Sequence, residues 1–292
     1  MDMTGGEQEI CTAIRRRVAA EGITPETLAA FQRLVYEHYR RHPRSFPWRE
    51  TRDPYRILVS EVMLQQTPVE RVRDTFTAFV AAFPDFASLA RASLQEVLAA
   101  WQGLGYNRRA VALNRTAQEV VQRFDGVLPS DEATLRSLPG IGPYTAAAVR
   151  AFAFDRPAVV IDTNIRAVFI HCFLGEASKV SDAALRPLVE QSMDREHPRD
   201  WYSALMDFGA LVKQRHPNPS RKSAHYSRQT PFEGSNRQVR GRILKAVLAE
   251  PGISREDLAD ALGVSLHRVT PLVDQLKREG FIAEERTGLR IA

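Results

Sequence analysis

Two carboxylates in this chain stand in positions where a carboxylate could do chemistry. Glu61 interrupts an apolar helical run that contains Leu58, Val62 and Met63. A carboxyl group in a desolvated pocket has a raised pKa, which suits a general acid. Asp162 opens a second predicted helix, where its charge could stabilise a developing cation. The alternatives are a glutamate that extends to the helix surface and an aspartate that only caps its helix.

A glycine-rich turn between two helical patterns precedes Asp162. Gly140 and Gly142 permit a tight turn because they have no Cβ. Pro143 suits the first helical position, where its missing N–H leaves no donor unpaired. The free amides at that helix start can bind a phosphate through the backbone alone. The alternative is an ordinary glycine-rich joint between two helices.

These motifs together resemble a known family. LPGIGPYTAAAVR with the downstream Asp162 resembles the helix–hairpin–helix motif of the HhH-GPD superfamily of DNA base-excision glycosylases. FPWR at 46–49 and SEVMLQQT at 60–67 narrow the resemblance to the A/G-specific adenine glycosylases, the MutY type. The resemblance covers 46–212. It implies an all-α, two-lobed helix–hairpin–helix body that flips a mispaired base out of double-stranded DNA and removes it.

The resemblance gives each catalytic candidate a role. Glu61 would protonate the leaving purine, Asp162 would stabilise the sugar cation, and Asn164 would help to hold the acid and the water. Tyr144 stands where strand-cutting members carry a lysine, and a phenol cannot form their Schiff base. The resemblance therefore implies a monofunctional glycosylase.

The same resemblance implies a set of DNA contacts. Their positions here are Gly140, Gly142, Thr145, Gln66, Leu64, Tyr106 and Arg49. Core packing is the alternative explanation for Leu64 and Tyr106. A surface ion pair with a nearby acid is the alternative for Arg49.

The segment 213–236 departs from the family, which carries four cysteines here for a [4Fe–4S] cluster. This segment has no cysteine, and from Lys213 to Arg228 it has five Lys/Arg and no acid. The cluster is expected to be absent, because lysine, proline and serine cannot replace thiolates as iron ligands. The segment is then a basic loop near the nucleic-acid face. The alternative is a solvated, partly disordered linker with no role in binding. A structural monovalent cation at the hairpin is compatible with the resemblance.

Residues 237–292 form a separate unit with three helical patterns, Val239–Ala249, 254–262 and 266–279, and two short strands around a tip. This order resembles a winged helix–turn–helix. The third helix would enter a DNA groove and carries Pro271, which predicts a kink or a late start. A docking site for another protein is the alternative. The family usually has a NUDIX-like domain here, so the preference for the opposite base is open.

Other helices must position the candidate residues. The helices expected besides that of Glu61 are 6–21, 25–39, 68–82, 85–90, 93–101, 108–124, a short helix capped by Ser130 and Asp131 before the hairpin, 143–153, 162–175, 181–194 and 200–213. The fold class is therefore all-α. The predicted divisions are an N-terminal helical extension (1–26), the glycosylase domain (27–212), the basic linker (213–236) and the winged unit (237–292).

Composition sets broad limits. The 292 residues are 44% hydrophobic and 26% charged, with a net charge of +5 that weakly favours a polyanionic partner. Cys11 and Cys172 have no metal-ligand spacing and predict no disulfide framework, which suits a reducing cytoplasm. The N-terminus lacks a secretory signal, and no long apolar run exists. The expected location is the cytoplasm, in association with the nucleoid.

Two alternatives compete with adenine removal. A mismatch-specific thymine or uracil glycosylase is the first, because the domain that reads 8-oxoguanine is missing. By the resemblance, Tyr144 occurs in both kinds of enzyme and does not choose between them, whereas PWR, SEVMLQQT and VIDTN favour adenine. A DNA-binding protein that keeps the scaffold without the chemistry is the second. Glu61, Asp162 and Tyr144 argue against it.

Overall fold

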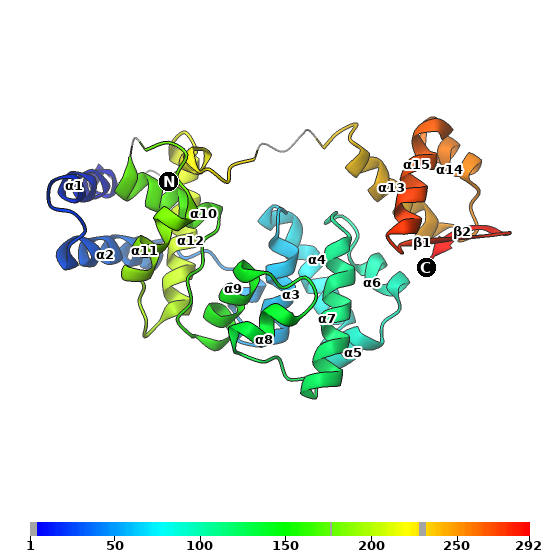
Figure 1. Cartoon of the computed structure of the whole chain (residues 1–292), viewed down its shortest axis with the longest axis horizontal. Coiled ribbons are helices and arrows are strands. Elements are labelled where there is room, and N and C mark those ends of the chain that lie inside the picture. The colour runs from blue at the N-terminus through cyan, green and yellow to red at the C-terminus, as the bar shows by residue number, and fades with distance from the viewer. Residues whose placement is uncertain (1–4, 176, 228–231) are drawn as a thin grey trace. The chain divides into compact units, whose positions relative to one another are not determined.

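The computed structural model describes residues 5–175, 177–227 and 232–292, and nearly all of its regular structure is helical (Figure 1). Within those ranges the only strands are a short C-terminal pair. This confirms the all-α fold class. No helix among these residues is long and apolar enough to cross a membrane.

The chain folds into two compact units whose segments alternate along the sequence. The first unit comprises Met1–Glu61, Pro129–Ser137 and Ile141–Ser227. The second comprises Val62–Leu128, Leu138–Gly140 and Arg228–Ala292. The second unit thus groups the middle of the expected 27–212 domain with the winged unit.

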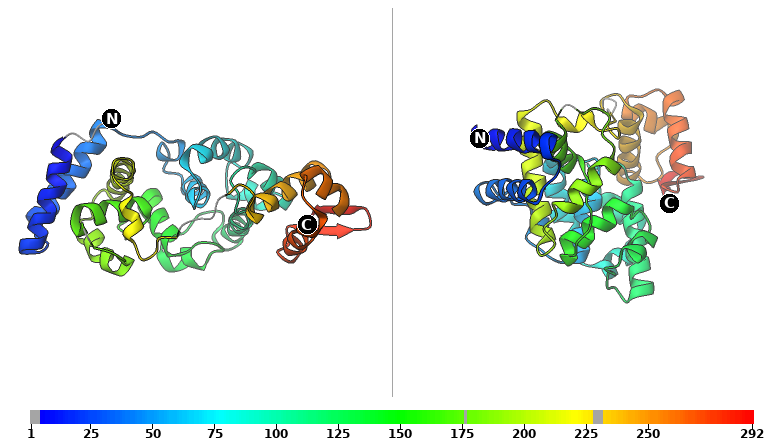
Figure 2. Two further views of the ribbon diagram at one scale, coloured as in Figure 1. Left: turned by 90° about the horizontal axis from the view of Figure 1, so that it is seen from above. Right: turned by 60° about the vertical axis from the view of Figure 1, so that its left-hand side comes forward.

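The first unit is built on two N-terminal helices and a long central helix, α12. Both views of Figure 2 show α1 and α2 side by side. The N-cap of α2 is Thr24, whose hydroxyl accepts from the amide of Thr27, and Pro25 occupies the first turn. The elements of this unit are α1 (Gly5–Glu21), α2 (Pro25–Arg41), the 3₁₀ turn η1 (Pro47–Arg49), most of α3 (Pro54–Leu64), α8 (Glu132–Ser137), α9 (Pro143–Phe154), α10 (Thr163–Phe169), η2 (Ile170–Leu174), α11 (Asp182–Gln191), α12 (Pro198–Arg215) and the 3₁₀ turn η3 (Pro219–Lys222).

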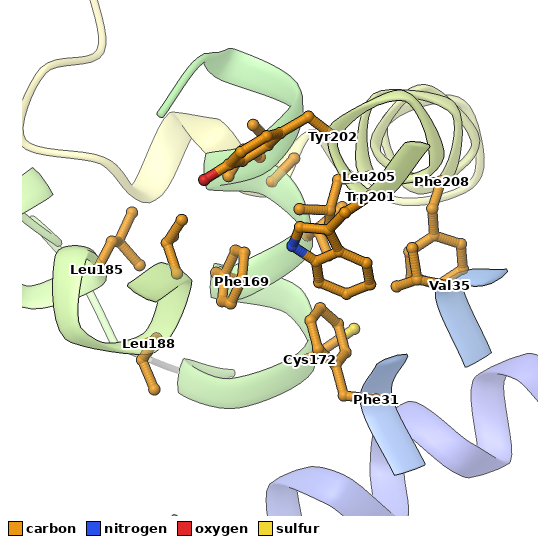
Figure 3. Close-up of a cluster of buried hydrophobic side chains, with 14 of the residues drawn as sticks. Phe31, Val35, Phe169, Cys172, Leu185, Leu188, Trp201, Tyr202, Leu205 and Phe208 are labelled. Atoms are coloured by element: carbon orange, nitrogen blue, oxygen red, sulfur yellow. The ribbon is translucent and has the colours of Figure 1, made fainter. Parts of the chain in front are cut away.

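Aromatic side chains from α2, α10, η2 and α12 form the core of the first unit (Figure 3). Phe31 packs edge-on against Phe173 and Trp201, with ring centroids 4.9 and 5.8 Å apart. Buried aromatic pairs in this geometry add to the stabilisation from apolar burial. The helix expected at 162–175 changes to π-helical geometry at Ile170, which places His171 and Cys172 in the interior.

The segment after α12 is partly packed rather than a plain linker. η3 follows α12, and Ser220 and Ser223 are buried. The backbone of Ser223 bridges to Val180, and Lys222 donates to the carbonyl of Gly175 at 2.6 Å. The expected basic loop therefore contributes ordered backbone to the first unit, at least through these residues.

The second unit begins with four helices, α4 (Val69–Ala82), α5 (Phe86–Arg91), α6 (Leu94–Ala100) and α7 (Arg108–Phe124). A capping box between Ser93 and Glu96 begins α6, where the sequence predicts a helix start at 93. Trp101 and Phe79 pack edge-on in the interior, with centroids 5.7 Å apart. The polar joint that follows Trp101 leads into α7.

The winged unit has helices α13 (Asn236–Ala249), α14 (Arg255–Leu262) and α15 (Leu266–Arg278), followed by strands β1 (Ile282–Glu285) and β2 (Gly288–Ile291). The strands are antiparallel, with Ile282 opposite Ile291. Helix α15 runs through Pro271 from its predicted start at Leu266.

Candidate active site

Glu61 lies on α3 and is only 6% exposed. Its neighbours on the helix, Leu58, Val62 and Met63, are buried as well. Burial raises the pKa of Glu61 to about 7, and the negative charge of Asp162 acts in the same direction. The carboxyl therefore holds a proton at near-neutral pH, which a general acid requires.

Tyr144, in the first turn of α9, contacts this carboxyl. Its hydroxyl donates to Oε2 of Glu61 at 3.3 Å, a bond that favours the ionised carboxylate and lowers its pKa. Burial, and then the charges of Glu61 and Asp162, raise the pKa of the Tyr144 phenol well above its usual value. The phenol thus stays neutral and acts as a fixed donor.

We expect Tyr144→Phe to shift the alkaline limb of the pH–rate profile to higher pH. Loss of the donor raises the Glu61 pKa above about 7, and the protonated carboxyl is the active form. The wild type therefore loses activity as pH rises through about 7, and the variant loses it at higher pH. Single-turnover rates measured across this range test the shift. Tyr36→Phe, whose hydroxyl donates to Asp194 at 2.7 Å, is the matched control.

Asp162 is the N-cap of α10. Its Oδ1 accepts from the amides of Asn164 and Ile165 at 2.9 and 2.7 Å, and its Oδ2 accepts from the Asn164 side chain at 2.8 Å. Burial nevertheless raises its pKa, while these hydrogen bonds and the charge of Lys213 lower it. The carboxylate is thus held in one direction by the same hydrogen bonds that cap α10.

Lys213 and Gly209 support Asp162, and the sequence reasoning missed both. The charge of Lys213, near the end of α12, opposes that of Asp162, and burial lowers the Lys213 pKa. A Cβ on Gly209 would lie 2.6 Å from the carbonyl oxygen of Asn164. Only glycine lets α12 approach α10 this closely. A glycine inside an apolar helical pattern was the available signal.

Arg49 is held by a buried aspartate. Its Nη1 and Nη2 donate to the two oxygens of Asp207 at 2.9 and 2.8 Å, and Arg44 also donates to Asp207 at 2.6 Å. The Asp207 side chain is only 1% exposed. Arg49 therefore forms an ion pair, as the alternative explanation predicted, but its partner is a buried aspartate rather than a surface acid. The Arg49 charge also lowers the pKa of Glu61, so it belongs to the electrostatics of the site.

Asp207 could have been found from the sequence, because it interrupts the apolar run ALMDFGALVK as Glu61 interrupts its own. A buried charge is tolerated only when it is paired and hydrogen-bonded. The two arginines satisfy this condition.

The glycine hairpin separates α8 from α9. Gly140 has φ +73, and a Cβ there would lie 2.7 Å from Cβ of Ala112. Gly142 is the N-cap of α9 and Pro143 its first residue, as predicted. Thr145 is only 2% exposed, so a phosphate at this helix start would meet its backbone rather than its side chain.

The remaining predicted DNA contacts lie in the second unit. Leu64 is half-buried at the end of α3, and Gln66 is exposed with φ +55. Tyr106 is half-buried and also left-handed, with φ +48. Arg109 connects the backbone next to Gln66 with Tyr106. It donates to the carbonyl of Gln65 at 2.5 Å, and its guanidinium lies 5.3 Å from the Tyr106 ring centroid.

Comparisons with known proteins find the family of this chain. Residues 59–191 match the model of the HhH-GPD superfamily of base excision DNA repair proteins, and residues 237–283 match a winged helix-turn-helix DNA-binding model. An adenine DNA glycosylase of Mycolicibacterium smegmatis is 37% identical over 226 residues, which cover 72% of this chain and 76% of the relative.

Glycosylases that are named for thymine or uracil are also similar to this chain. A thymine/uracil-DNA glycosylase of Methanothermobacter thermautotrophicus is 33% identical over 172 residues, 58% of this chain and 78% of the relative. The solved structure of a thermostable thymine-DNA glycosylase matches with a TM-score of 0.56 and 28% identity, covering 63% of this chain and 86% of that one.

Proposed function

This chain belongs to the adenine DNA glycosylase family of the HhH-GPD superfamily, and we propose that it is a monofunctional glycosylase that removes adenine paired with 8-oxoguanine or guanine. The observation that carries the proposal is the buried carboxyl of Glu61, whose pKa is about 7. Tyr144 donates a hydrogen bond to it, and the negative charge of Asp162 raises its pKa. Its place of action is then the DNA of the nucleoid.

In the proposed reaction, Glu61 gives its proton to a ring nitrogen of the flipped purine. The bond between the base and C1′ of the sugar breaks, and its electron pair leaves with the base. Asp162 stabilises the cationic sugar until water adds to C1′, and the proton released by that water returns to Glu61. The products are the free base and an abasic site, and two carboxyl groups suffice for both tasks, one as the proton donor and one as the charge that faces the sugar.

The monofunctional assignment rests on Tyr144. Strand cleavage through a Schiff base requires an amine, and the residue in contact with Glu61 carries a phenol instead. We propose that borohydride traps no covalent adduct between the wild-type protein and DNA with an abasic site. A trapped adduct would overturn the assignment, whatever base the enzyme releases.

The DNA contacts proposed for this reaction are of two kinds. The backbone at the start of α9 would hold a phosphate, supported by the glycine N-cap and the proline that follows it. Gln66 and Tyr106, both left-handed, stand on the short joints after α3 and before α7 and would fill the gap left by the flipped base.

A panel of duplexes tests the function, with adenine, thymine or uracil placed opposite guanine or 8-oxoguanine. Alkali then reveals abasic sites as strand breaks. Release of adenine supports the proposal. Release of thymine or uracil alone would favour the second candidate, a mismatch-specific thymine/uracil glycosylase, to which the similarity to such a relative points. No release from any duplex would leave only DNA binding.

We propose that the protein holds no iron–sulfur cluster, because the thiolates that a cluster needs are not available. The chain has two cysteines, and both are buried in the first unit, with Sγ atoms 2.7 Å apart. A [4Fe–4S] cluster takes four thiolates. The purified protein is expected to be colourless and free of iron by elemental analysis. Stoichiometric iron with cluster absorbance would contradict this.

A further inference from the structure

Two cationic side chains of helix α15, Arg268 and Lys277, have partners close to them in the same unit. Arg268 donates to the carbonyl of Gly234 and to Asn236. Lys277 forms an ion pair with Glu284, and Arg255 pairs with the same carboxylate at 2.7 Å. In these contacts the two cations are paired with a neighbouring acid and with carbonyl oxygens. Two of the cations of α15 therefore already have partners on this unit.

The winged unit instead contacts the joint that carries Tyr106. Arg237, in the first turn of α13, donates to the Tyr106 hydroxyl at 2.7 Å. Its guanidinium carbon also lies 5.4 Å from the centroid of the Tyr106 ring. The left-handed backbone of Tyr106 is strained for a side-chain-bearing residue, so surrounding contacts must hold it. Arg237 provides one such contact from a distant part of the sequence.

Arg109 holds Tyr106 from within α7. Besides lying 5.3 Å from the ring centroid, Arg109 donates to the carbonyls of Val62 and Met63 at 2.8 and 2.9 Å. These carbonyls belong to the last turn of α3, where backbone acceptors lack helical partners. Tyr106 is thus held between a cation tied to the end of α3 and a cation of the winged unit.

An ion pair provides a second contact, between the winged unit and the first residue of α7. Glu279, which follows α15, has a side chain only 11% exposed and pairs with Arg108 at 2.8 Å and with Arg240 at 2.6 Å. These two arginines lower the pKa of Glu279 against the effect of its burial. An acid placed between one arginine of α7 and one of α13 fixes where Arg237 meets Tyr106.

We propose, resting on the proposed glycosylase function, that Arg237 is a positioning residue for Tyr106. Through this contact the winged unit sets the preference for the base opposite the target. The unit acts on the glycosylase joint rather than by inserting α15 into a groove.

The test uses the full chain with Arg237→Met, Tyr106→Phe and the double variant. We measure single-turnover adenine release opposite 8-oxoguanine and opposite guanine, and take the ratio of the two rates. Each single variant is expected to reduce this ratio about tenfold, the worth of a hydrogen bond to a charged group. The double variant should reduce the ratio no further than the single variants do, because both substitutions remove the same contact. Lys245→Met, an exposed charge on the same helix, is the matched control.

The salt dependence of DNA binding separates positioning from direct phosphate contact. The slope of log affinity against log salt is expected to be the same for Arg237→Met and the wild type. A slope reduced by about one would mean that Arg237 binds a phosphate, and would overturn the proposal. So would additive effects in the double variant, or an unchanged ratio in a folded Arg237→Met. A wild type that releases no base from any duplex would instead refute the proposed function.

Discussion

The Glu61→Gln variant is expected to bind DNA nearly as well as the wild type and to release base about 10²- to 10⁴-fold more slowly, the range for loss of a general acid. The amide preserves the shape of the side chain and can still accept the Tyr144 hydroxyl. It has no acidic proton, so the leaving base must depart without protonation.

Single-turnover base release and equilibrium binding to a mispaired duplex check this expectation together. Glu70→Gln, at an exposed position on α4, is the matched control and should leave both unchanged. The residual activity of Glu61→Gln should also lack the fall above pH about 7 that titration of Glu61 causes. A variant that still excises at a near wild-type rate would remove Glu61 from the acid role.

Asp162→Asn is expected to reduce base release by on the order of 10³-fold, because a fixed charge aimed at the developing cation is lost. The asparagine oxygen can still accept from the amides of Asn164 and Ile165, so the start of α10 remains capped. The loss should therefore appear in the rate and not in the melting temperature.

The chain provides a matched control for helix capping. Asp131 accepts from the amide of Thr134 at 2.8 Å before α8, in an exposed position. Asp131→Asn should leave base release and melting temperature close to wild type. If the rate of base release by Asp162→Asn instead fell in proportion to its melting temperature, Asp162 would serve only as a helix cap.

The sequence determined the helices and the types of the candidate residues, because those signals are local. The proline after Thr24 and the capping box at Ser93 mark helix starts through contacts within four residues. The three helices and two strands of the winged unit follow from the same kind of signal. The carboxylate at Glu61 was conspicuous because it interrupts an apolar run.

Only the tertiary structure decided which groups act on one another. Tyr144 meets Glu61 across 83 positions, and Arg237 meets Tyr106 across 131. No periodicity encodes such pairs, because they depend on how distant helices pack. The pKa of Glu61 illustrates the reason. Desolvation, the hydrogen bond from Tyr144 and the charges of Asp162 and Arg49 act on it, and these come from the surrounding structure rather than from the sequence neighbours.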